Sequence, residues 1–188
     1  LGNGRVTGCE ALLRWRHPLR GLISPVEFIP VAEDTGMINE LGDWVLNKAC
    51  SEAATWPDDV SVAVNVSPVQ FRNPAFSLKV AMALAKSGLP ARRLELEITE
   101  AVLIRDDDAA LAMLYSLRSL GVRIALDDFG TGYSSLSYLQ RLPLDQLKID
   151  QSFVRDVLHS ANDAAIVRTI LSLAHSMALT VVAEGVET

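Results

Sequence analysis

The sequence has few cysteines, few aromatic residues and no long hydrophobic run. Its 188 residues include only Cys9 and Cys50, too few for a disulfide framework and typical of a reducing compartment. No stretch of about 18 or more uncharged apolar residues occurs, and the first residues lack the basic-then-apolar order of a signal peptide. We therefore expect a cytoplasmic domain without a membrane segment of its own, although its parent protein can be anchored in a membrane.

The chain also lacks an excess of basic residues. It has 17 Lys and Arg against 23 Asp and Glu, for a formal net charge of -6. Such a chain does not present the broad basic surface that binds DNA or RNA, so we predict no nucleic-acid partner. Any phosphate-containing ligand needs cations at its site. The length and the 49% hydrophobic content suffice for one large core, so we expect a single domain over residues 1–188.

Predicted strands and helices alternate along the whole chain. The strands are expected at residues 5–15, 61–68, 94–100, 122–126, 146–150 and 180–185. The helices are expected from Ser24-Pro25 to Gly36 and over residues 38–56, 76–87, 107–120 and 162–177. This alternation is the rhythm of βα units and predicts an α/β fold with a parallel sheet.

Polar side chains stand near the ends of these predicted strands. They are Glu10, Asn65, Glu97, Asp127, Asp128, Lys148 and Glu184. The carboxyl ends of strands in a parallel sheet or barrel share one side of the domain, so we expect a common site there. Carboxylates and an amide form a hard oxygen set that favours Mg²⁺ or Mn²⁺. The three histidines, His17, His159 and His175, lack metal-ligand spacing and are interpreted as ordinary residues.

The adjacent Asp127 and Asp128 follow an apolar run and precede a glycine-rich turn. Two neighbouring carboxylates repel each other unless a cation or a shared proton neutralises them. The alternative is a solvated acidic turn. A second ambiguity concerns Arg14, which alternation places on the face of Glu10, where a cross-strand ion pair is the alternative to a binding role. Glu95 lies deeper on the face of Glu97, and pairing with Lys148 is its simplest expected role.

Three motifs resemble the hallmark sequences of EAL domains, the bacterial cyclic di-GMP phosphodiesterases. They are Glu10-Ala11-Leu12, Asp127-Asp128-Phe129-Gly130-Thr131-Gly132 and Glu184-Gly185-Val186-Glu187, and the resemblance runs from Gly8 to Thr188. It implies a TIM-type (β/α) barrel and metal-dependent hydrolysis of cyclic di-GMP to linear 5'-pGpG. Because barrels host many chemistries, the matched residues carry this inference rather than the fold. An unrelated metal-dependent barrel enzyme would require the motif agreement to be accidental.

The resemblance also implies two Mg²⁺ or Mn²⁺ ions. Glu10, Asn65, Glu97 and Asp127 resemble the ligands of one ion. Asp127 and Asp128 resemble those of the second, with Asp127 bridging the two. Calcium prefers larger and looser coordination and is expected to occupy such a site unproductively.

Further roles follow from the resemblance. Lys148 and Glu184 resemble the catalytic residues that hold and deprotonate the attacking water. Leu12 and Arg14 belong to the substrate-binding segment, with Arg14 gripping a phosphate, which replaces the ion-pair interpretation. Glu100 resembles a glutamate that steadies the loop after the aspartate pair. Glu187 resembles a residue at dimer contacts, so a homodimer is implied.

The family pattern departs from this sequence at both ends. EAL domains begin with a strand carrying a Gln-Pro pair and finish with a strand bearing a Gln-Gly pair, and neither lies within residues 1–188. We therefore expect an incomplete barrel of about six of the eight strands. The parent is expected to add a sensory or GGDEF-type domain, and residues 1–188 alone are expected to be inactive. A catalytically inactive module that binds cyclic di-GMP is the alternative function, although the intact ligand set favours the enzyme.

Overall fold

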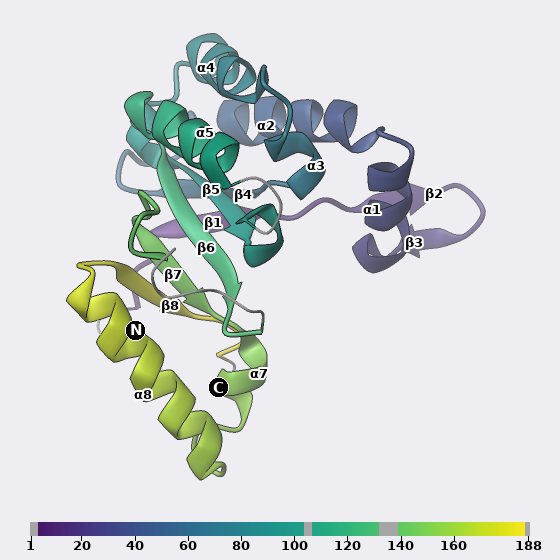
Figure 1. Ribbon diagram of the computed structural model, residues 1–188. Coiled ribbons are helices and arrows are strands. Elements are labelled where there is room, and N and C mark those ends of the chain that lie inside the picture. The colour runs from purple at the N-terminus through teal and green to yellow at the C-terminus, as the bar shows by residue number, and fades with distance from the viewer. Residues whose placement is uncertain (1–3, 104–106, 132–138, 187–188) are drawn as a thin grey trace.

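One six-stranded parallel sheet forms the centre of the protein. The computed structural model describes residues 4–103, 107–131 and 139–186 (Figure 1). The strands follow one another in the sheet in chain order, each hydrogen-bonded to the next. They are β1 (Gly8–Ala11), β4 (Ser61–Asn65), β5 (Leu94–Thr99), β6 (Arg123–Phe129), β7 (Gln146–Ile149) and β8 (Thr180–Ala183).

The sheet curls into part of a barrel with helices on its outer side (Figure 1). The principal helices are α1 (Pro25–Asp34), α2 (Ile38–Ala53), α4 (Phe76–Ser87), α5 (Asp107–Ser119) and α8 (Ala161–Ser176). Short helical segments complete the chain, namely α3 (Pro68–Phe71), α7 (Gln151–Arg155), and the 3-10 turns η1 (Ala91–Arg93) and η2 (Glu100–Leu103). The predicted α/β architecture of (β/α) type is therefore confirmed, with all six predicted strands in one sheet.

Alternation along β5 separates the apolar core from the polar interior of the curl. Leu94, Leu96 and Ile98 are fully buried and belong to the hydrophobic core. Glu95 and Glu97, which point to the opposite face, are also buried. A strand buried on both faces is typical of parallel sheets covered by helices. The carboxylates of β5 consequently lie inside the protein rather than in water.

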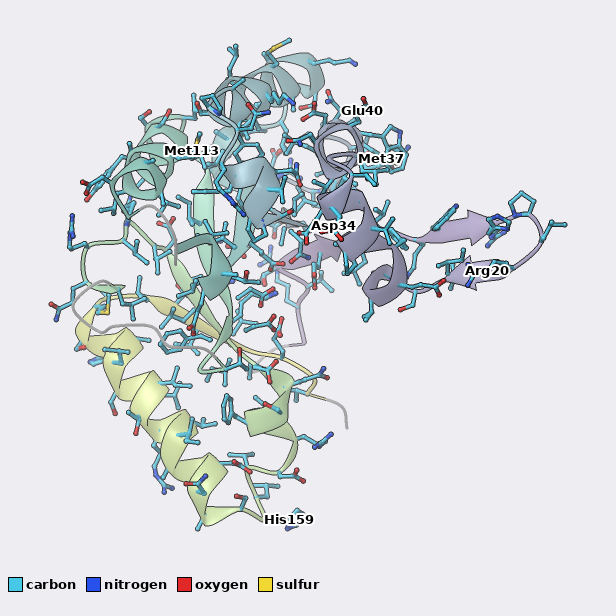
Figure 2. The ribbon with its side chains drawn as sticks, turned by 45° about the vertical axis from the view of Figure 1, so that its right-hand side comes forward. Arg20, Asp34, Met37, Glu40, Met113 and His159 are labelled. Atoms are coloured by element: carbon cyan, nitrogen blue, oxygen red, sulfur yellow. The ribbon has the colours of Figure 1, made fainter. Side chains whose placement is uncertain are left out.

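The first strand is shorter than the predicted range of residues 5–15. β1 ends at Ala11, where its pairing with β4 stops at Val64. Residues Trp15–His17 instead form β2, which pairs antiparallel with β3 (Gly21–Ile23). This hairpin projects away from the sheet, with Arg20 near its tip (Figures 1 and 2). The alternating sequence pattern over residues 5–15 therefore did not reveal that the chain leaves β1 at Ala11 and begins β2 at Trp15.

β6 is longer than the predicted range of residues 122–126. It continues to Phe129, so Asp127 and Asp128 lie within the strand and not in the turn after it. The register with β7 shifts between Leu126 and Phe129, which marks an irregularity of the bulge type at the two aspartates. The helices predicted over residues 38–56, 107–120 and 162–177 are observed, and their ends differ from the predicted ones by at most three residues.

Within the described ranges, no helix is both long and apolar enough to cross a membrane.

Candidate active site

Lys148 stands at the centre of a buried cluster of carboxylates. Its Nζ lies 2.8 Å from Glu97 Oε1, 3.1 Å from Asp127 Oδ1 and 2.7 Å from Glu184 Oε1. These residues belong to β5, β6, β7 and the end of β8, so four neighbouring strands converge on one point. The Lys148 side chain is only 6% exposed. The predicted gathering of strand-end groups is thus realised around this ammonium.

Burial and mutual charge alter the protonation of the cluster. Burial raises the pKa of Glu97 to about 7, although the hydrogen bond and charge of Lys148 act in the opposite direction. Burial also raises the pKa of Glu184 above its ordinary value, again partly offset by Lys148. For Lys148, burial opposes the charged form, but Glu184 and Glu97 outweigh it and hold the pKa above its ordinary value. The lysine is therefore a fixed cation among acids of increased proton affinity.

The two aspartates differ in environment although they are adjacent. Asp127 is buried, whereas Asp128 is exposed and has a left-handed backbone with φ of 52°. The backbone N–H of Asp128 donates to Asp127 Oδ1 at 3.0 Å. Partial desolvation of its carboxyl group by the surrounding protein and the nearby charge of Asp127 raise the pKa of Asp128 to about 6. A non-glycine residue in this conformation is strained, which is common where a side chain is directed into a functional site.

Asp150 joins the site although the sequence interpretation did not select it. Its carboxylate lies close enough to that of Asp128 to contribute to the raised pKa of Asp128, and it caps α7 by accepting from the backbone N–H of Ser152 at 2.9 Å. The hydrogen bonds from Ser152 lower the pKa of Asp150. The available signal was its position two residues after Lys148, where strand alternation points it to the same face.

Glu10 and Asn65 form a separate pair on the adjoining strands β1 and β4. Asn65 Nδ2 donates to Glu10 Oε1 at 2.6 Å, and both residues are exposed. The charge of Glu10 also contributes to the raised pKa of Glu97 and of Glu184, so the pair faces the carboxylate cluster. The predicted metal ligands therefore fall into two groups that act on each other through charge, Glu10 with Asn65 and Glu97 with the two aspartates.

The donor set fits a divalent cation. Oxygen atoms of Asp127, Asp128 and Glu184 lie within 4.8 Å of one another. Glu97 Oε2 is buried and has no hydrogen-bond partner among the described residues. A buried carboxylate oxygen without a partner is costly, and a cation is one way to satisfy it. A set made only of carboxylate and amide oxygens suits Mg²⁺ or Mn²⁺ rather than zinc.

The loop after β6 is held from two sides. Glu100 is buried, and its Oε1 accepts a hydrogen bond from the backbone N–H of Gly130 at 3.2 Å. Gly130 has φ of 102°, and a Cβ atom there would lie 3.0 Å from the ring of Phe153. Glu100 thus contacts the loop that the resemblance implied. Glu187, the expected dimer-contact residue, lies outside the described residues.

Leu12 and Arg14 lie beyond the end of β1 rather than on the strand. Leu12 is 54% exposed, and Arg14 is exposed with its Nη1 donating to the carbonyl of Leu13 at 2.9 Å. The strand alternation that set Arg14 on the face of Glu10 therefore does not apply, because pairing stops at Ala11. No ion pair joins Glu10 and Arg14 in the described structure. Both side chains remain accessible to a ligand.

Glu95 does not pair with Lys148 as expected. Its Oε1 accepts from Gln146 Nε2 at 2.9 Å, and its Oε2 lies 3.3 Å from Arg123 Nη2. Lys148 extends instead toward the strand ends, where Glu97, Asp127 and Glu184 neutralise it. The expectation was wrong because Arg123, which pairs with Glu95 in the register of β5 and β6, and Gln146 are closer partners.

The fold and the cluster define a class of protein, the (β/α) barrel proteins with acidic residues gathered at the carboxyl ends of their strands. Comparison with known proteins narrows this class. The sequence profile of the EAL domain matches residues 1–188. The chain belongs to the EAL domain family.

Individual relatives cover the chain almost completely. It is 54% identical over 186 residues to an uncharacterized signaling protein of Caulobacter vibrioides, covering 99% of this chain and 23% of the relative. It is 48% identical over 190 residues to the bifunctional diguanylate cyclase/cyclic di-GMP phosphodiesterase MucR of Pseudomonas aeruginosa, covering 99% of this chain and 28% of that protein. The chain therefore spans about a quarter of the length of these curated relatives.

A solved structure of the MucR phosphodiesterase in complex with c-di-GMP has the same fold. It superposes with a TM-score of 0.94 at 48% identity, covering 99% of this chain and 77% of that chain. This agreement supports the curled parallel sheet described above.

Proposed function

We propose that the full-length protein hydrolyses cyclic di-GMP to linear 5'-pGpG with the help of two divalent cations. The observation that carries this proposal is the convergence of Glu97, Asp127 and Glu184 on Lys148 at the strand ends. The EAL relatives named as cyclic di-GMP phosphodiesterases support the same substrate. An intact set of acidic residues at these positions favours an enzyme over the alternative, a module that binds cyclic di-GMP without cleaving it.

Five residues of the site would hold the cations. Glu10, Asn65, Glu97 and Asp127 are proposed to hold one, and Asp127 and Asp128 the other. The partnerless Oε2 of buried Glu97 supports this assignment. When bound, the cations supply Lewis-acid stabilisation of the phosphodiester oxygens and lower the pKa of coordinated water. They also offset the repulsion between the acidic site and an anionic substrate.

Lys148 and Glu184 are proposed to manage the attacking water. The Lys148 ammonium is buried and faces three carboxylates, and its three N–H donors would become available to hold the water where a bound cation takes over those carboxylates. Glu184 is half-buried, and its raised pKa makes it a better proton acceptor than an ordinary surface carboxylate. Both groups therefore act where hydroxide is generated and aligned.

Arg14 and Leu12 are proposed to bind the substrate. Arg14 is exposed beside the Glu10–Asn65 pair and has spare guanidinium donors, which suit a phosphate group. Leu12 offers an exposed apolar surface next to it. Substrate binding then uses the accessible end of the site, while the chemistry uses its buried centre.

Product analysis with the full-length protein tests the proposal. Incubation with cyclic di-GMP and Mn²⁺ is expected to yield linear 5'-pGpG as the first product. Asp127→Asn, which removes one carboxylate charge with little change of shape, is expected to abolish this product. Binding of cyclic di-GMP without any cleavage by the wild-type protein would favour the non-catalytic alternative.

The cellular setting is proposed from the same relatives. We infer a cytoplasmic location, a homodimer that uses the region of Glu187, and a diguanylate cyclase or sensory domain in the full-length protein. The bifunctional name of MucR supports the cyclase partner. Residues 1–188 are proposed as part of one phosphodiesterase domain.

A further inference from the structure

A second polar layer lies inside the sheet below the carboxylate cluster. Glu95, Arg123 and Gln146 form a closed ring of three contacts, which we call the lower ring. Gln146 Nε2 donates to Glu95 Oε1 at 2.9 Å, Arg123 Nη2 lies 3.3 Å from Glu95 Oε2, and the same nitrogen donates to Gln146 Oε1 at 3.4 Å. Glu95 and Gln146 are 6% and 8% exposed. Each member thus contacts the other two.

The lower ring stands on the three strands that carry the centre of the active site. Glu95 precedes Glu97 by two residues on β5, and Gln146 precedes Lys148 by two residues on β7. Arg123 begins β6, the strand of Asp127. Two residues along a strand span about 7 Å, so Glu95 and Gln146 lie one layer below Glu97 and Lys148, whereas Arg123, four residues before Asp127, lies two layers below it on β6. The lower ring faces the same interior, because side chains two residues apart point the same way.

Strand β6 needs such support because its pairing with β7 is irregular. The register is regular at Ala125 and Gln146 but shifts between Leu126 and Phe129, where Asp127 and Asp128 lie. A register slip of one residue would turn every side chain to the opposite face. Ala125, the residue between Arg123 and Asp127 on this face, has only a methyl group with which to fix the strand.

Simple stabilisation is a weak explanation of the lower ring. Burying an ionic group costs free energy, and well-packed apolar residues of similar volume often replace such groups without loss of stability. A fully connected polar network, by contrast, fixes one arrangement of its strands. The ring also adds no net charge, because Glu95 and Arg123 cancel. Its effect on the site above is therefore positional.

We propose that Glu95, Arg123 and Gln146 are positioning residues that hold β5, β6 and β7 in the register at which Lys148 meets Glu97 and Asp127. The catalytic meaning of this role rests on the proposed phosphodiesterase function. The ring does not touch the substrate. It acts through the strands, and its loss displaces the ammonium and its carboxylates relative to one another.

The test replaces the neutral member of the ring in the full-length protein. Gln146→Met preserves size and charge but removes both hydrogen bonds. Gln140→Met is the matched control, because Gln140 is exposed and lines the same surface hollow as Arg123 without joining the ring.

We measure kcat and KM for cyclic di-GMP, Mn²⁺ affinity by titration, and the melting temperature. Gln146→Met is expected to lower kcat and Mn²⁺ affinity by about 10-fold to 100-fold, with KM within about two-fold of wild type. Gln140→Met is expected to match the wild type.

A swap variant separates positioning from packing. Glu95→Gln combined with Gln146→Glu exchanges the amide and the carboxylate, so the ring and its charge can reform. This double variant is expected to recover kcat and Mn²⁺ affinity to within about three-fold of wild type, whereas Glu95→Gln alone is not. Because Glu95→Gln is isosteric, it also keeps the test valid should Gln146→Met fail to fold.

Two results would overturn the proposal. One is a Gln146→Met protein that melts at a lower temperature yet keeps wild-type kcat and Mn²⁺ affinity, which would make the ring purely structural. The other is a swap variant no better than Glu95→Gln. A wild-type protein that binds Mn²⁺ without cleaving cyclic di-GMP would refute the proposed function alone, since Mn²⁺ affinity still reports on the ring. A wild-type protein that neither binds Mn²⁺ nor cleaves cyclic di-GMP would refute the proposed function and the positioning role together.

Discussion

The inner strands of the sheet differ from its two outer strands in burial and in the chemistry they carry. Every residue of β7 is buried, as are five of the six residues of β5. β1 and β8, by contrast, contain no fully buried residue. The inner strands supply Glu97, Asp127 and Lys148, whereas β1 supplies the exposed Glu10. The site is therefore assembled across a gradient from the protein interior to its surface.

Under the proposed function, this gradient in burial separates the groups that hold the attacking water from the groups that bind the ligand. Charges interact more strongly when water is excluded, so the buried lysine and its carboxylates can fix a water molecule and its proton. Burial accordingly raises the pKa of Glu97 to about 7, while Arg14 near the outer strand remains exposed. Groups that must bind and release a ligand are better placed where water can return. Under the proposed function, chemistry falls to the centre of the sheet together with Glu184 after β8, and recognition falls to the β1 edge.

The largest expected effect comes from the central lysine. Lys148→Ala in the full-length protein is expected to lower kcat by about 10²-fold to 10⁴-fold, the range typical of losing a group that positions or transfers protons. KM for cyclic di-GMP is expected to change only a few-fold, because the substrate binds at the accessible end. Lys48→Ala is the control, since Lys48 is 59% exposed and pairs with Glu52 on the surface of α2.

Steady-state kinetics of both variants decide this prediction. Lys48→Ala is expected to behave as wild type, in line with the small contribution of exposed ion pairs. A Lys148→Ala protein that lost substrate binding while keeping its kcat would show that Lys148 binds the substrate and does not take part in the chemistry. If Lys148→Ala does not fold, the same kinetic test uses Lys148→Met, whose side chain is of similar length but carries no charge.

The same comparison predicts a difference in stability. Val62 on β4 is 1% exposed, and Val182 on β8 is 37% exposed. Val62→Ala is expected to reduce the free energy of unfolding by about 2 kcal/mol, because two buried methyl groups leave a cavity. Val182→Ala, the same chemical change, is expected to cost less than about 1 kcal/mol. Denaturant unfolding measures both, and equal losses would mean that β8 is as well packed as the inner strands.

The two cysteines give the smallest and most local contrast. Cys9 is exposed on β1, whereas Cys50 on α2 is fully buried, and burial raises the pKa of its thiol to about 11. Because the thiolate is the reactive species, alkylation at pH 8 is expected to label Cys9 quickly and Cys50 much more slowly. Mass spectrometry of the labelled peptides assigns each rate. Comparable rates at the two positions would show that α2 opens readily from the sheet.

Much of this architecture could be predicted from local sequence patterns. All six strands of the sheet were predicted, because each combines an apolar run with a turn signal and a helix follows at regular intervals. Polar residues at strand ends likewise predicted a shared site, since parallel strands end on one side. The convergence of Glu97, Asp127 and Glu184 on Lys148 is the structural outcome.

The remaining features depend on pairing partners that a single segment does not reveal. Alternation continues through Arg14, but β1 ends at Ala11, where its pairing with β4 stops. The strained backbone of Asp128 and its proximity to Asp150 arise where β6 and β7 shift register. The role of Glu95 required knowing that the side chains of Arg123 on β6 and Gln146 on β7 reach it. Tertiary register, not local propensity, decides each of these.

Metal-dependent turnover of cyclic di-GMP by the full-length protein tests the central claim most directly. The protein is stripped with a chelator, its metal content is verified by elemental analysis, and turnover is followed as Mn²⁺, Mg²⁺ or Ca²⁺ is returned. The account predicts no 5'-pGpG without metal, recovery with Mn²⁺ or Mg²⁺, and none with Ca²⁺, whose looser coordination suits the site poorly. Undiminished formation of 5'-pGpG by verified metal-free protein would contradict it.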